Sequence, residues 1–82
     1  MVNGMRRDKN TITCSAVDFG KGKILTAFIF DPNNKKSAEL SFKELSEGLY
    51  TLVHNFPIIG RYTMIVLEDG KPTKQDFIDI VL

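Results

Sequence analysis

The sequence predicts an all-β fold, an antiparallel β-sandwich of about six or seven strands. Apolar and polar residues alternate in several segments, and this period of two is typical of strands with one buried face. Turn-forming residues separate these segments about every 10 to 13 residues, and no long segment shows a helical period. The chain has 82 residues, 43% of them hydrophobic and 26% charged, which is ordinary for one small globular domain.

Residues 1–10 contain little apolar material, so we expect a flexible N-terminal leader followed by a single domain over residues 11–82. No apolar stretch of a secretory signal follows Arg6 and Arg7, and no segment approaches the roughly 20 apolar residues of a membrane helix. We therefore expect a protein that is cytoplasmic as synthesised, with no signal peptide or transmembrane segment. The single cysteine, Cys14, excludes an internal disulfide framework and is expected to be reduced and buried.

The first two strands are expected over residues 11–17 and 24–30, joined by a glycine-rich turn. The first alternates apolar residues with threonine and serine. The second is apolar on both faces, which is typical of a strand in the middle of a sheet. One of its faces carries Ile24, Phe28 and Phe30, and the other carries Leu25, Ala27 and Ile29.

Residues 37–48 allow two interpretations. Leu40 and Phe42 alternate with polar residues as in a strand, whereas Ser41 and Glu44 have the spacing of a helix capping box that Gly48 would end. A helix this short is marginal on its own, so tertiary contacts must decide. A strand with a tight loop and one short helical turn near 41–48 both stay open.

The remaining strands are expected over residues 49–56, 60–67 and 74–82, each with alternating apolar positions. Asp69-Gly70 is a strong hairpin signal, although Pro72 favours a turn longer than two residues. The last strand is apolar enough to pair with another chain at an exposed edge, unless it is buried between the sheets.

A short pattern, Gly-x-Tyr-Thr, begins at Gly48 and again at Gly60. In each copy the tyrosine two residues later is placed to bury its ring while its hydroxyl caps a loop carbonyl. This is the geometry of the tyrosine corner in immunoglobulin-like sandwiches.

Residues 11–81 resemble the short immunoglobulin-like modules of bacterial and phage (prophage) structural proteins. The resemblance is carried by a strand ending in Asp31-Pro32, by the segment from Leu45 to Tyr50, and by Gly60-Arg61-Tyr62-Thr63-Met64. The chain has one Cys and no Trp, so it lacks the Cys…Trp…Cys set of antibody-type domains. The resemblance implies an immunoglobulin-like fold and a structural accessory protein, associated with a virion.

No arrangement of residues points to catalysis, a metal or a cofactor. The single histidine, His54, lies on an apolar strand face, and the neighbouring carboxylates fall in predicted turns. The glycines and lysines over residues 20–23 lack the spacing of a phosphate-binding loop. We therefore expect a protein that is not an enzyme, with no catalytic, metal-binding or cofactor-binding residues.

The net charge of +1 conceals two unequal halves, because residues 1–36 carry +4 and residues 37–82 carry −3. If these halves lay on different faces, the domain would carry a dipole suited to head-to-tail association. The alternative is ordinary scatter of charge in a small chain. Neither half indicates a nucleic-acid or membrane partner.

We therefore expect a structural, assembly or protein-interaction module whose partner is another protein or a second copy. Contacts are expected from two connecting segments, at Phe19, Lys21 and Lys23 and at Ile58, Ile59 and Arg61. Ile58 and Ile59 are either a partner anchor or a plug beneath the core. The alternative function is a carbohydrate- or surface-binding β-sandwich module, which would need exposed aromatic side chains.

Overall fold

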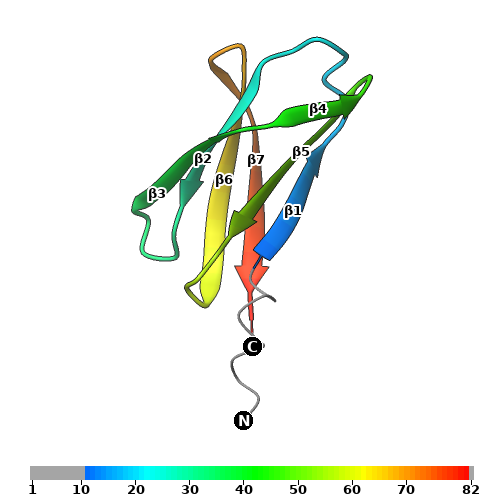
Figure 1. Ribbon diagram of the computed structural model, residues 1–82. Coiled ribbons are helices and arrows are strands. Elements are labelled where there is room, and N and C mark those ends of the chain that lie inside the picture. The colour runs from blue at the N-terminus through cyan, green and yellow to red at the C-terminus, as the bar shows by residue number, and fades with distance from the viewer. Residues whose placement is uncertain (1–10, 82) are drawn as a thin grey trace.

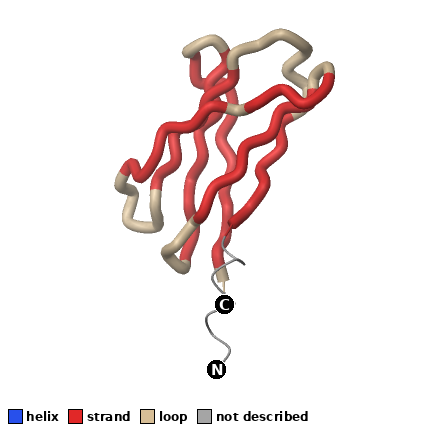
Figure 2. The backbone as a smooth tube through the Cα atoms, viewed as in Figure 1, coloured by secondary structure: helices blue, strands red, loops and turns tan. Residues whose placement is uncertain are grey.

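The computed structural model describes residues 11–81, which form seven antiparallel strands in two sheets (Figure 1). One sheet has the order β1-β5-β4 and the other has the order β3-β2-β6-β7. The predicted all-β sandwich is confirmed, and the described residues contain no helix (Figure 2). The expected leader, residues 1–10, lies outside the described residues. The strands are β1 (Thr11–Ala16), β2 (Leu25–Phe30), β3 (Lys36–Ser41), β4 (Lys43–Ser46), β5 (Leu49–Asn55), β6 (Gly60–Glu68) and β7 (Lys71–Ile80).

The strand order is that of an immunoglobulin-type sandwich. If the strands are lettered B, C, C′, D, E, F and G along the chain, the sheets read B-E-D and C′-C-F-G. The chain crosses between the sheets at Phe42, whose amide donates to the Leu25 carbonyl over 2.9 Å. Leu40 and Phe42 pack against the core on either side of this crossing. The segment 41–48 is therefore strand and turn, and the helical alternative is wrong.

The core is a single layer of side chains between the two sheets. The central strands β2 and β6 supply most of it, because each points alternate residues inward. The inward faces expected for β1, β2, β5 and β6 are confirmed. The principal cluster consists of Ala27, Ile29, Leu52, Phe56, Tyr62, Met64, Val66 and Ile80, each no more than 6% exposed.

The tyrosines of the repeated pattern tie loops to this core. Both rings are about 1% exposed, as predicted. The Tyr50 hydroxyl donates to the Gly20 carbonyl over 2.6 Å and accepts from the Lys23 amide over 2.9 Å. The Tyr62 hydroxyl accepts from the Ile58 amide over 3.0 Å, which is the geometry of a tyrosine corner. The carbonyl cap is thus found at Tyr50, whereas Tyr62 binds an amide.

The β6–β7 connection is a two-residue turn made by Asp69 and Gly70. Their φ angles of 51° and 88° are both positive, as a type I′ turn requires. The expectation of a longer turn is wrong because Pro72 is accommodated within β7. That strand lies at the edge of its sheet, where a missing amide donor is tolerated, and the register shifts between Val66 and Leu67 opposite it.

The two charge halves of the sequence do not separate onto different faces. Strands from both halves alternate within both sheets. Ion pairs also join the halves, from Lys21 to Glu47 over 2.9 Å and from Lys23 to Glu68 over 3.4 Å. Among residues 11–81, the fold therefore builds no dipole from the unequal halves.

Gly60 is the glycine whose replacement should cost most. Its φ is +135°, and an added Cβ would lie 2.9 Å from both Cβ and Cγ of Pro32. We expect Gly60→Ala to lower the free energy of unfolding by about 2 kcal/mol or more, from backbone strain together with this overlap. Gly48→Ala is the matched control, with φ +78° but open space around the new methyl, and should cost about 1 kcal/mol. Urea unfolding measures both; equal losses would show that Pro32 moves aside at no cost.

Candidate interaction surface

Four large apolar side chains lie on the side of the four-stranded sheet that faces away from the core. Because Ala27 and Ile29 of β2 point inward, its phenylalanines must point outward. The register then aligns them with outward residues of β6 and β7 in two neighbouring rows. Phe77 is 54% exposed and the others are half-buried. We call this the outer aromatic face, made of Phe28, Phe30, Ile65 and Phe77.

An arginine and an aspartate form one rim of the outer aromatic face. The Arg61 guanidinium lies 5.0 Å from the centre of the Phe77 ring. It donates to Asp79 through Nε over 2.8 Å and through Nη2 over 3.2 Å. This hydrogen bond, together with the attraction of the charges, lowers the pKa of Asp79 and raises the pKa of Arg61. Both side chains are exposed, so the pair orients the arginine more than it stabilises the fold.

A lysine and a glutamate form the opposite rim, on β3. The Lys36 ammonium lies 4.1 Å from the centre of the Phe28 ring and 2.9 Å from a carboxylate oxygen of Glu39. Each rim therefore places one cation against a phenylalanine and one anion beside that cation. An apolar centre with a polar rim is the usual anatomy of a protein–protein interface.

The six predicted contact residues do not form one surface. The β1–β2 loop lies at one end of the sandwich and the β5–β6 loop at the other (Figure 1). The fold therefore brings together only the three residues of each group. Phe19, Lys21 and Lys23 lie at the first end, and Ile58, Ile59 and Arg61 lie at the second.

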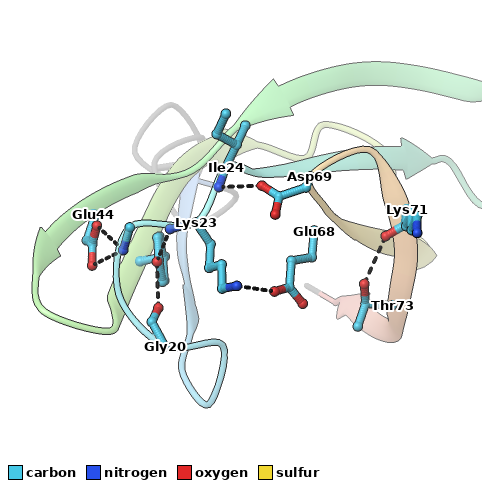
Figure 3. Close-up of polar contacts among 10 residues, drawn as sticks. Gly20, Lys23, Ile24, Glu44, Glu68, Asp69, Lys71 and Thr73 are labelled. Carbon is cyan, nitrogen blue, oxygen red and sulfur yellow. Dashed lines mark hydrogen bonds and ion pairs between the residues drawn. The ribbon is translucent and has the colours of Figure 1, made fainter.

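The β1–β2 loop is held by bonds to its own domain. Phe19 packs against both core clusters, and the two lysines form the ion pairs described above. Figure 3 shows two backbone amides of this loop bound by carboxylates of other strands and turns: Gly22 by Glu44 over 3.1 Å, and Ile24 by Asp69 over 3.2 Å. These contacts account for the polar and charged side chains at this end as supports of the loop.

The β5–β6 loop presents apolar side chains to solvent. Ile58 is 40% exposed and Ile59 is 53% exposed, so neither plugs the core from below. Val81, 71% exposed, follows β7, and the pairing of Gly60 with Ile80 brings it toward Ile59. Arg61 is the next outward residue of β6, so this apolar end is continuous with the outer aromatic face.

The outer aromatic face was missed as a site by reasoning from sequence. Its signal was present, because β2 and β6 are apolar on both faces. In a fold of only two layers, one face of each strand must point to solvent. A second apolar face therefore indicates a surface patch here, and not only a central position in the sheet.

The side chains with chemical potential lie apart from one another. His54 packs edge-to-face on Phe56 with ring centres 4.8 Å apart, and burial lowers its pKa. Burial, with a smaller contribution from the charge of Asp76, raises the pKa of the Cys14 thiol. Among residues 11–81, no three His, Cys, Asp or Glu side chains gather as metal ligands would. No helix capable of spanning a bilayer is found in that same part of the chain.

Comparison of the chain with protein-family models, with curated proteins and with solved structures gave no match. Function therefore has to be inferred from the residues and the geometry described above.

The lowered pKa of His54 predicts a stability that falls on mild acidification. The unfolded imidazole titrates near pH 6.5 and the folded one titrates lower. Between these two pKa values the unfolded chain binds more protons, so the free energy of unfolding decreases as the pH falls through this window. Urea unfolding from about pH 7.5 to about pH 5.5 should show the decrease in the native chain and a smaller one in His54→Gln. Equal decreases in both chains would assign the effect to carboxylates instead.

Proposed function

We propose that this protein is a non-enzymatic interaction module of a structural assembly, and that it binds protein through the outer aromatic face. The observation that carries the proposal is the position of Phe28, Phe30, Ile65 and Phe77. The core is complete on the other side of their sheet, and the described residues place no third layer over them. Contiguous exposed apolar side chains with a polar rim favour a binding site for protein.

The partner that these observations favour is a second copy of the chain. A face-to-face pair can bring the β3 rim of one copy against the β7 rim of the other. One rim carries Lys36 and Glu39 and the other carries Arg61 and Asp79, so each rim offers both signs of charge. The resemblance of residues 11–81 to modules of phage structural proteins supports a role of the same kind, in an assembly of many copies.

The size of the face predicts weak self-association. Four strands about 4.8 Å apart, with about six residues each, define an area of roughly 400 Å². This is about half of the roughly 800 Å² that each partner buries in a stable interface. Ile58, Ile59 and Val81 extend the apolar area at one end. A dimer that forms in the micromolar range or above fits this geometry.

The alternative, a carbohydrate-binding module, has less support. Phe77 with Arg61 and Asp79 does combine an aromatic ring with polar groups, as a sugar site requires. However, cations already lie over the rings of Phe77 and Phe28, where a sugar would stack. The outer aromatic face therefore suits protein better than carbohydrate.

Replacing Phe77 should weaken self-association. Phe77→Ser removes the most exposed ring of the outer aromatic face, and we expect the dissociation constant to rise by roughly tenfold. Val53→Ser is the matched control, because Val53 is 62% exposed but belongs to the other sheet. Sedimentation equilibrium and light scattering from tens of micromolar to about 1 mM measure the effect. A native chain that stays monomeric throughout, or an equal loss in Val53→Ser, would contradict the proposal.

The double variant Ile58→Ser/Ile59→Ser should also weaken self-association, by a smaller factor, because these side chains lie at the border of the face. The same sedimentation experiment measures it. Its thermal unfolding should stay close to native, since both side chains are exposed. A large fall in stability would instead show that the isoleucines support the core.

A further inference from the structure

Three of the four edge strands carry devices that discourage pairing with another chain. β3 and β4 contain charged side chains, and the register of each with its neighbour shifts. β7 contains Pro72, and its ladder with β6 also shifts. In addition, Lys74 and Asp76 of β7 pair with Val66 and Met64, so these charges lie on the inward face of the sheet. Charges, shifts, proline and inward charges all protect sheet edges.

The fourth edge strand, β1, has none of these devices. Its six residues, TITCSA, contain no charge and no proline, and its register with β5 runs without a shift from Thr11 to Ala16. β1 pairs with β5 on one side only. Among the described residues, the backbone groups that point away from β5 therefore have no strand beside them.

A cavity of about 200 Å³ opens beside this free edge, between β1 and β7. Figure 1 shows these two strands on the same side of the sandwich. Cys14 and Ala16 form the β1 wall, Met64 and Val66 the floor, and Asp76 and Ile78 the β7 wall. The β1 wall is made of small side chains, which leave the space between the sheets unfilled. An apolar cavity of about 150 Å³ accommodates a benzene-sized group, so this one has room for a valine or isoleucine side chain.

We propose that β1 is an acceptor strand for an extended segment of a partner protein. The segment is uncharged and has apolar side chains at alternate positions. Its backbone pairs with the free edge of β1, and one of its side chains enters the cavity. Backbone pairing supplies affinity in this mode of recognition, and a pocket for alternate side chains supplies specificity. The site is independent of the outer aromatic face, because β1 belongs to the other sheet.

The chain itself supplies no obvious occupant. Four consecutive charged residues lie at positions 6–9, and residues 1–10 contain no three apolar residues at successive alternate positions. In a second copy, every described strand is already paired. An uncharged edge above an apolar cavity instead matches an uncharged, alternating segment from another protein.

A thiol-protection experiment tests this proposal in the full chain. Cys14 lines the cavity and is the only cysteine, so alkylation by iodoacetamide reports on this site alone. The probe is a capped peptide of about nine residues in which valine alternates with threonine and serine. At a free peptide concentration ten times its dissociation constant, the alkylation rate should fall about tenfold. The amides of β1 that point away from β5 should become protected from hydrogen exchange.

Matched controls separate this site from non-specific binding and from the outer aromatic face. A peptide of the same composition without alternation should give no protection. Ile78→Phe, which fills the cavity mouth, should weaken peptide binding about tenfold with its fold confirmed by circular dichroism. Phe77→Ser should leave the protection unchanged, so failure of the outer-face proposal does not affect this test.

Several results would overturn the proposal. One is no protection at millimolar peptide, and another is equal protection by the two peptides. A third is protection that grows with protein concentration in the absence of peptide, which would assign the edge to a second copy. A fourth is concentration-independent protection of the outward amides of β1 without peptide, which would assign the edge to residues 1–10.

Discussion

Every inward side chain of this sandwich serves both sheets, because only one layer of side chains separates them. Large aromatic rings bridge that layer, and the rings of Phe56 and Tyr62 meet edge-to-face with centres 4.9 Å apart. From the same layer, the hydroxyl of Tyr50 holds the β1–β2 loop and that of Tyr62 holds the β5–β6 loop. The two ends of the domain are thus positioned by the layer that also joins the sheets.

This constraint places the features available to partners on the faces and edges. Where the shared layer is well filled, as under β2 and β6, the opposite face of the sheet presents Phe28 and Ile65 to solvent. Where the layer is thin, between Cys14 and Ile78, a cavity opens instead. The outer aromatic face and the β1 edge are therefore two consequences of packing two sheets with a single layer.

The sequence predicted the strands whose alternation depends on local residues, such as β5 and β6, and the hairpin at Asp69-Gly70. It left the segment 41–48 open because both patterns there are locally acceptable. The decision rests on the amide of Phe42 bonding to Leu25, far away along the chain. Pro72 misled for a related reason, since its tolerance depends on β7 being an edge strand. The cavity had no sequence signal, because it exists only where β1 and β7 lie on the same side of the sandwich.

The two proposed surfaces share one strand. Along β7, Phe77 points to the outer aromatic face, whereas its neighbours Asp76 and Ile78 line the cavity. A strand added beside β1 would press on these neighbours, and any displacement of β7 would carry Phe77 and its partner Arg61 with it. Coupling between two binding sites is reciprocal in free energy, so a copy bound on the outer face would change the affinity of the β1 edge by the same factor. The alternation of β7 thus links the surface that would join copies to the edge that would recognise a different chain.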